Sequence, residues 1–201
     1  MPTERTIPLP ADPADPVQRA VQARAFCSLL ASGRPVPVEG LSRSEQHAVA
    51  DLRQRGRLTL TAHGAIDGSL GLTIRPTRHR LELAEGVRYT WCALDAVAIM
   101  ATLERTGTVV SRPPDSRDSV QVAFAAGEVA QAPDGAALLV PGAATGPVVQ
   151  TWCPLANLFT GAEQAHVFAR RRGLTDYTVL DLGEAIAEGV PLWTAALRDT
   201  T

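Results

Sequence analysis

The stretch that decides the fold is residues 89–104, which read YTWCALDAVAIMATLE. From Trp91 onward the side chains are apolar almost without interruption, and the run is longer than a typical strand. The pattern predicts a buried helix over residues 91–104, with Thr90 as its N-cap. Cys92 and Asp95 would then lie on one helix face with Cβ atoms about 5–6 Å apart, close enough to act on the same atom.

The two polar residues of this helix indicate chemistry as well as structure. Cys92 would sit in the first turn, where unpaired N–H groups and the helix dipole favour a thiolate over a thiol. Asp95 would cost on the order of several kcal/mol if it were buried, charged and unpaired. We therefore expect it to have a raised pKa and to store a proton. Two simpler interpretations stay open: Cys92 as a small buried apolar residue, and Asp95 as a helix cap.

A second Trp-Cys pair, Trp152-Cys153, occurs later in the chain. Residues 148–151 are predicted to form a short strand that leads into Cys153, and residues at strand ends often face clefts. Packing in the core is the alternative for this thiol, and it is the expected role of Cys27 in a predicted amphipathic helix. The histidines lack metal-ligand spacing, so no zinc site is predicted from His47, His63, His79 and His166.

The N-terminal part of the chain predicts two helices after a flexible arm. Residues 1–16 contain many prolines and no apolar period, which is typical of an arm outside the fold. Apolar residues at helical spacing predict a first helix over residues 17–32. A second helix is predicted to begin at Ser42 or Ser44 and to end at Gly56.

Two short strands, at residues 58–61 and 69–74, are predicted to follow, joined by a loop that holds Asp67 and Gly68. Two helices and a hairpin over residues 17–80 are the outline of a winged helix. Such a module binds DNA in some proteins and serves only packing in others. Packing is the favoured interpretation here, because the chain has no net positive charge to attract polyanions.

The remainder, residues 81–201, predicts a catalytic core domain of mixed-sheet α+β type, so the fold class as a whole is α+β. Turns that contain Gly or Pro separate its apolar segments. The predicted strands are residues 78–83, 108–111, 120–124, 136–140 and 177–182, and the predicted helices are residues 162–172 and 183–197, the second broken at Pro191.

Composition limits the class of protein. Of 201 residues, 45% are hydrophobic, so a packed core is expected. A net charge of −2 argues against a nucleic-acid partner. No apolar run approaches the roughly 18–20 residues that span a bilayer, and no signal peptide is recognisable, so the expected location is the cytoplasm. Three cysteines in that reducing compartment favour metal or redox chemistry, and no phosphate-binding loop, dinucleotide fingerprint or nucleophile elbow is present.

With these motifs the chain resembles the alkylmercury lyases, also called organomercurial lyases. The resemblance rests on residues 89–95 (YTWCALD), residues 150–153 (QTWC) and residues 157–159 (NLF), and it extends over residues 40–200. It implies a mixed α+β core with a winged-helix-like part ahead of it, in agreement with the organisation predicted above.

The resemblance implies that Cys92, Asp95 and Cys153 are the catalytic residues and also the mercury ligands. The implied reaction is protonolysis: the two thiolates bind mercury, Asp95 protonates the carbon, and a hydrocarbon and Hg(II) result. Soft thiolates select soft metals, and a positioned acid completes the step. Trp91 and Trp152 would form the substrate pocket. No cofactor is implied. The implied partners are an organomercurial substrate, small thiols and a mercuric reductase that accepts Hg(II).

Two neighbourhoods depart from the family, whose members often carry extra cysteines there. This chain has Pro154 after the second motif cysteine and SRP at residues 111–113.

Two other classes of protein compete with the lyase interpretation. A metal or metalloid sensor would bind the ion at both thiols and DNA through the winged helix, and a thiol redox protein would join Cys92 to Cys153. Only the lyase interpretation uses Asp95 directly.

Overall fold

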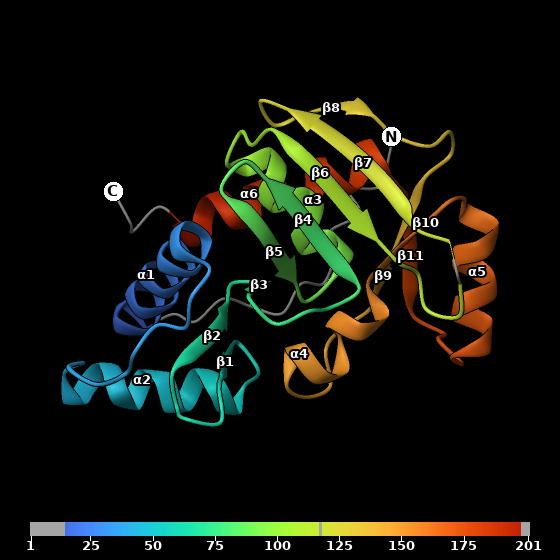
Figure 1. The fold of residues 1–201 in the computed structure, drawn as a ribbon. Coiled ribbons are helices and arrows are strands. Elements are labelled where there is room, and N and C mark those ends of the chain that lie inside the picture. Colours follow the sequence, from blue (N-terminus) through green and yellow to red (C-terminus); the bar gives the residue numbers. More distant parts are fainter. Residues whose placement is uncertain (1–14, 117, 198–201) are drawn as a thin grey trace.

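The computed structural model describes residues 15–116 and 118–197, and the predicted N-terminal arm lies almost wholly outside them. The described residues form an eight-stranded sheet and a three-stranded sheet, with helices packed on and between them (Figure 1). The α+β class is therefore confirmed. No helix in the described ranges combines the length and the apolar character needed to cross a membrane.

The large sheet is antiparallel throughout. Its strands are β1 (Leu58–Leu60), β2 (Ile66–Ser69), β3 (Leu72–Thr73), β4 (His79–Leu83), β5 (Gly86–Thr90), β6 (Gly107–Ser111), β7 (Val120–Ala125) and β8 (Glu128–Gln131). They are arranged in the order β1-β2-β3-β5-β4-β6-β7-β8, with Leu81 of β4 opposite Arg88 and Val109 on its two neighbours. Buried and exposed residues alternate along β7, as expected when one face of a sheet is packed and the other is solvated.

The small sheet has β9 (Ala137–Pro141) at its centre, paired antiparallel with β10 (Asn157–Phe159) and β11 (Tyr177–Asp181). All of β9 is buried, which explains why it reads as a continuous apolar run. Helix α5 (Ala162–Arg171) packs on this sheet through Phe168 in a small hydrophobic cluster of its own.

Helices α1 (Pro16–Ser32) and α2 (Arg43–Gln54) confirm the predicted N-terminal pair. α1 ends at Gly33, whose left-handed φ of 62° is accessible to glycine without strain. α2 begins at Ser42, whose hydroxyl accepts a hydrogen bond from the N–H of Glu45 while the Glu45 carboxylate accepts one from the N–H of Ser42. This reciprocal pair is a capping box.

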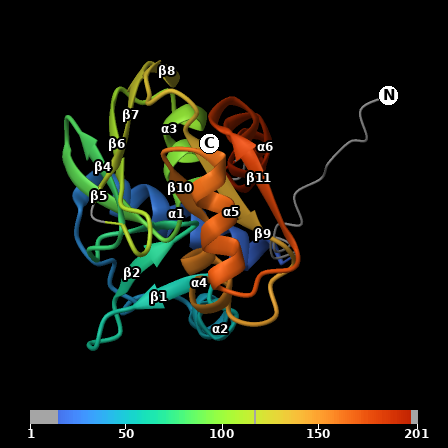
Figure 2. The same cartoon turned by 90° about the vertical axis from the view of Figure 1, so that its right-hand side faces the viewer.

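Helix α3 (Ala93–Thr102) lies between the two sheets, in the centre of the molecule (Figure 2). It contacts β4, β5 and β6 on one side, β9 and β10 on the other, and helix α6 (Leu182–Leu197). The α3–α6 approach is close, because a Cβ on Gly189 would lie 2.6 Å from the Cβ of Ala98. α6 continues through Pro191, so the predicted break is wrong; the loss of one helical hydrogen bond does not outweigh this packing.

The predicted hairpin after α2 is organised differently. The predicted strand over residues 69–74 contains a two-residue turn at Leu70 and Gly71, which both have positive φ, and the predicted loop residues Asp67 and Gly68 lie in β2. Strand β3 pairs with β5, so the large sheet continues through this part of the chain. A winged helix is therefore not confirmed, and the division into two domains stays a prediction.

A second local prediction fails next to Cys153. Residues Val148–Thr151 form a short helix, α4, and not a strand, and a 3₁₀ turn, η1 (Cys153–Leu155), follows it. Pro147 is the N-cap of α4 and Pro154 lies at the start of η1, positions where the fixed φ and the missing N–H of proline are tolerated. Three strands, β5, β8 and β10, were not predicted.

Candidate functional site

Cys92 is the N-cap of α3, and Asp95 is the third residue of that helix. The N–H of Asp95 donates to Cys92 Sγ at 3.3 Å, and the N–H of Cys92 donates to Asp95 Oδ2 at 3.1 Å. This is a capping box in which a thiol replaces the usual hydroxyl. The prediction of Thr90 as the cap is wrong: Thr90 ends β5, and its hydroxyl donates to the carbonyl oxygen of Cys92 at 2.8 Å.

The carboxyl group of Asp95 also accepts a hydrogen bond from the thiol, with 3.0 Å between Cys92 Sγ and Asp95 Oδ2. Both side chains are buried. Burial raises the pKa of Asp95 to about 6, while hydrogen bonds from Cys92 and the positive charge of Arg57 act in the opposite direction. The expected rise in pKa is confirmed. Asp95 is thus both a helix cap and a group that can exchange a proton near neutral pH.

The pKa of Cys92 differs from the expectation of a thiolate. Burial is the largest cause that raises the pKa of Cys92 well above its usual range, and Cys153 and the negative charge of Asp95 add to the rise. A helix N-terminus stabilises an anion by about 0.3–1 kcal/mol, less than the several kcal/mol that burying an uncompensated charge costs. The prediction of a thiolate is therefore wrong for the resting protein, in which a Cys92 thiol donates to an Asp95 carboxylate.

Cys153 is brought to the same place by the turn η1. One ligand atom from each of Cys92, Asp95 and Cys153 lies within 4.8 Å of the other two, and all three residues are buried. We call these residues the thiol–carboxyl cluster. Among the described residues it is the one group of three or more Cys, His, Asp or Glu side chains close enough to share a metal ion.

One backbone hydrogen bond joins the two cysteine segments, and a second hydrogen bond is local to the Cys153 segment. The N–H of Ala93, in the first turn of α3, donates to the carbonyl oxygen of Ala156 at 3.0 Å. The side-chain amide of Asn157 donates to the carbonyl oxygen of Pro154 at 2.8 Å. The main chain therefore ties the first turn of α3, next to Cys92, to the segment that follows Cys153.

Gly71 packs directly against the Asp95 carboxyl group, a contact that was not predicted from the sequence. A Cβ on Gly71 would lie 2.3 Å from Asp95 Cγ, and the φ of Gly71 is +78°. Its carbonyl oxygen accepts the N–H of Trp91 at 2.7 Å. The indole N–H of Trp193, on α6, donates to the carbonyl oxygen of Leu70 at 3.2 Å. Hydrogen bonds from Trp91 and Trp193 therefore anchor the turn between β2 and β3 next to the cluster.

The two motif tryptophans lie in different surroundings. Trp152 is buried, and its indole N–H donates to the carbonyl oxygens of Pro141 and Gly142 at 3.2 and 2.9 Å, which ties η1 to the end of β9. Trp91 is half-buried and lines a cavity of about 390 Å³. The predicted role of both tryptophans in substrate binding stays a prediction.

This cavity, which we call the arginine cavity, lies directly beside the cluster. It is lined by Thr77, Arg78, His79, Trp91, Pro114, Pro154, Leu155, Asn157 and Arg172. Two of these residues, Trp91 and Pro154, are the chain neighbours of Cys92 and Cys153. Cys92 and Cys153 are not among its lining residues.

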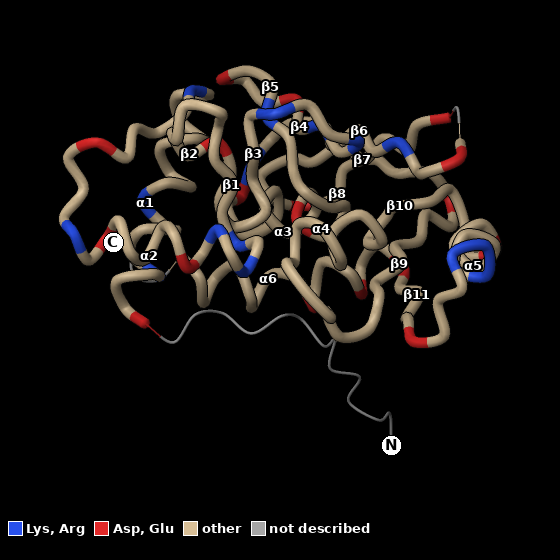
Figure 3. The backbone as a smooth tube through the Cα atoms, turned by 90° about the horizontal axis from the view of Figure 1, so that it is seen from below, with Lys and Arg blue, Asp and Glu red and all other residues tan. Residues whose placement is uncertain are grey.

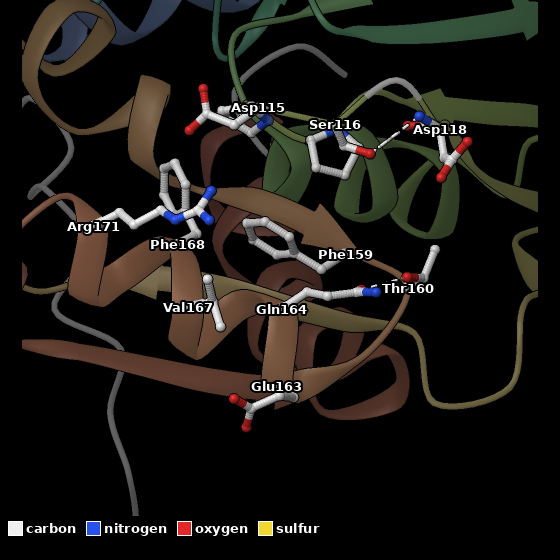
Figure 4. Close-up of a pocket in the computed structure, with 12 residues that line it drawn as sticks. Asp115, Ser116, Asp118, Phe159, Thr160, Glu163, Gln164, Val167, Phe168 and Arg171 are labelled. Carbon is white, nitrogen blue, oxygen red and sulfur yellow. Dashed lines mark hydrogen bonds between the residues drawn. The ribbon is translucent and has the colours of Figure 1, made fainter.

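A second cavity, of about 280 Å³, lies between α5 and the loop that follows β6. Figure 4 shows Phe159 and Phe168 at its centre and Asp115, Asp118 and Glu163 around it. None of its lining residues belongs to the thiol–carboxyl cluster. It is therefore a separate feature of the molecule.

The remaining predicted positions lie outside the site. Cys27 is exposed on α1, so the prediction that it packs in the core is wrong. No histidine joins the cluster among the described residues. Positive and negative residues are interspersed along the chain, and a run of positive residues marks the end of α5 (Figure 3).

Comparisons with known proteins agree with this geometry. Residues 72–194 match the family model for alkylmercury lyase, a range that contains the whole thiol–carboxyl cluster. An alkylmercury lyase of Streptomyces lividans is 30% identical over 189 residues, which are 89% of this chain and 84% of that protein. An alkylmercury lyase of Staphylococcus epidermidis is 35% identical over 92 residues, which are 44% of this chain and 42% of that protein.

A solved structure shares the fold. The mercury-bound form of MerB2 superimposes with a TM-score of 0.81 over 90% of this chain and 92% of that chain, at 21% sequence identity. The family model covers more than half of the chain, and the Streptomyces relative is matched over most of its length. This chain is a member of the alkylmercury lyase family.

Proposed function

We propose that this protein cleaves the carbon–mercury bond of organomercurials by protonolysis, with Cys92, Asp95 and Cys153 as the catalytic residues. The observation that carries the proposal is the hydrogen bond of 3.0 Å between the Cys92 thiol and the Asp95 carboxyl, inside a cluster whose ligand atoms lie within 4.8 Å. This arrangement brings together two sulfur ligands for a soft metal and one proton that can move between Cys92 and Asp95.

The first step is the capture of mercury. Cys92 Sγ attacks the mercury of R–Hg–X, where X is a halide or thiolate, and X⁻ departs as the S–Hg bond forms. The thiol proton moves along its existing hydrogen bond to the Asp95 carboxylate. Thiolate sulfur is the ligand that soft metals prefer, so the binding of mercury offsets the cost of removing a proton from a thiol with a raised pKa.

The second step breaks the carbon–mercury bond. Cys153 loses its proton to X⁻ or to solvent and donates its sulfur to mercury, which adds electron density and weakens the bond to carbon. Asp95 then gives the proton it received to that carbon, R–H departs, and Hg(II) stays between the two sulfurs. The pKa of Asp95, raised by burial to about 6, suits an acid that must accept and release one proton near neutral pH.

The surroundings support this scheme. Cys92 and Cys153 are buried, so water has little access to the reacting bond. We propose that Trp91 and Trp152 bound the space for the organic group. As written, the reaction consumes no cofactor, and small thiols or a mercuric reductase would remove the bound Hg(II).

The test is to incubate the protein with phenylmercuric acetate and excess thiol and to measure benzene in the headspace. Cys92→Ser, Cys153→Ser and Asp95→Asn should each lower the rate by about 100-fold or more, the range expected for loss of a nucleophile or an acid. Cys27→Ser is the matched control, because that thiol is exposed on α1. Retention of mercury without benzene would instead favour a metal-binding sensor.

A further inference from the structure

The charged side chains that line the arginine cavity are all positive. Its ionisable lining residues are Arg78, Arg172 and His79, and no carboxylate lines it. Burial lowers the pKa of His79 to about 3, helped by the charge of Arg78, so the imidazole is neutral at pH 7. The cavity therefore presents two positive charges and a neutral wall, although the formal net charge of the whole chain is −2.

The two arginines differ in how far they are already paired. Arg78 is exposed, and within the described ranges its side chain makes no ion pair or hydrogen bond. Arg172 lies over the ring of Phe168, 5.4 Å from its centroid, and its Nη2 is 3.9 Å from Oδ2 of Asp115. An ion pair of that length between exposed groups is weak. Arg172, like Arg78, can therefore bind an anion.

We propose that the arginine cavity binds the carboxylate of a small anionic thiol while the sulfur of that thiol exchanges mercury with Cys92 and Cys153. This proposal rests on the proposed function. Mercury cations in the presence of thiols travel as thiolate adducts, because soft metals prefer sulfur ligands. A thiol with a carboxylate a few bonds from its sulfur could place its anion between Arg78 and Arg172 and its sulfur beside Trp91 and Pro154, the chain neighbours of Cys92 and Cys153.

The exchange is balanced without an oxidant or reductant. Two thiols R′SH give their sulfurs to Hg(II), which leaves as Hg(SR′)₂, and their two protons restore the thiols of Cys92 and Cys153. In the reverse sense, an adduct R–Hg–SR′ could arrive through the same cavity. The cavity thus selects the thiol by charge, and selection does not depend on the identity of the organic group.

The experiment loads the protein with HgCl₂ and measures the rate at which thiols extract mercury. The thiols are 3-mercaptopropionate (anionic), 2-mercaptoethanol (neutral) and cysteamine (cationic), compared at equal thiolate concentration. The anionic thiol should be faster than the neutral one by about two- to fivefold per arginine, the range expected of exposed ion pairs, and the cationic thiol slower. The preference should weaken at high salt.

Variants test the residues. Arg78→Gln and Arg172→Gln should each reduce the preference, and the double variant should bring the three thiols within about twofold of one another. Arg80→Gln is the matched control, because Arg80 is exposed, pairs with Glu82 and does not line the cavity. Asp115→Asn should increase the preference, because it removes the carboxylate next to Arg172.

The outcomes separate this proposal from the lyase reaction. Equal extraction by the three thiols, or a preference that survives in the double variant, overturns the cavity proposal even if benzene is formed. A charge preference that depends on the arginines supports it even if no benzene is formed, because extraction requires bound Hg(II) and not carbon–mercury cleavage. Protein that takes up no mercury at its buried thiols overturns both.

Discussion

Replacing Asp95 with Asn should stabilise the protein at neutral pH. Burial raises the pKa of Asp95 to about 6, above its usual value of 3.8. A carboxyl group with a higher pKa in the folded state binds its proton more tightly there, so ionising it favours unfolding. The stability that this group contributes is complete below the unfolded pKa and is lost as the pH rises through about 6.

The magnitude follows from the two pKa values. A difference of about two units makes the ionised carboxyl cost about 3 kcal/mol at pH 7.5, about 1.6 kcal/mol at pH 5 and about 0.6 kcal/mol at pH 4. Asn keeps an oxygen that can accept the N–H of Cys92, and it carries no charge at any of these values. The free energy of unfolding of the variant, relative to wild type, should therefore increase by about 2 kcal/mol between pH 4 and pH 7.5.

The assay is urea unfolding of both proteins at several pH values in that interval. Glu45→Gln is a control with the opposite sign. The hydrogen bond from Arg24, followed by those of Ser42, lowers the pKa of Glu45 to about 2. That carboxylate stabilises the fold above its unfolded pKa, and the contribution is lost as the pH falls through the folded value. The loss caused by Glu45→Gln should therefore be largest at neutral pH and shrink on acidification.

A difference between Asp95→Asn and wild type that is the same at every pH would refute the reasoning, because it would show that the buried carboxyl titrates alike in the folded and unfolded states. A variant whose relative stability falls as the pH rises would be stronger evidence against it. In that case the ionised Asp95 would stabilise the fold, and burial would not be the dominant cause of its pKa.

Two further predictions concern the turn beneath the site. Gly71→Ala should lower kcat for carbon–mercury cleavage by about tenfold or more, because its Cβ would lie 2.3 Å from Asp95 Cγ. Gly64→Ala has a similar positive φ but nothing within 4 Å, so equal losses in both variants would contradict the contact argument. Trp193→Phe should lower the free energy of unfolding in urea by about 1 kcal/mol or more through the lost hydrogen bond to Leu70. An unchanged urea midpoint would show that this bond is dispensable.

Much of the architecture around the site follows from local patterns. Capping and glycine stops predict α1 and α2 to within two residues, because these signals act within one helical turn. The continuous apolar run after Trp91 predicts α3 as a buried helix, and the structure places that helix between two sheets. The proximity of Cys92 to Asp95 follows from helix geometry. The proximity of Cys153 does not, since it depends on how distant segments pack, and it was implied only by the family resemblance.

The failures occur where tertiary contacts override local preference. Leucine rarely adopts a positive φ, so residues 69–74 read as one strand, although Leu70 and Gly71 form a turn against Asp95. A thiol is not among the usual helix caps, so the cap was assigned to Thr90 and not to Cys92. In both cases the departure from local preference lies at the candidate site, where such departures are expected.

The two capping boxes show why the same local motif gives different chemistry. Ser42 with Glu45 and Cys92 with Asp95 make the same reciprocal hydrogen bonds at the start of a helix. On the surface, those bonds and Arg24 lower the pKa of Glu45 to about 2, and the carboxylate only stabilises the helix. In the core, burial outweighs similar hydrogen bonds and raises the pKa of Asp95 to about 6. Burial therefore converts a cap into a proton carrier, and the thiol that replaces the cap hydroxyl becomes the ligand beside it.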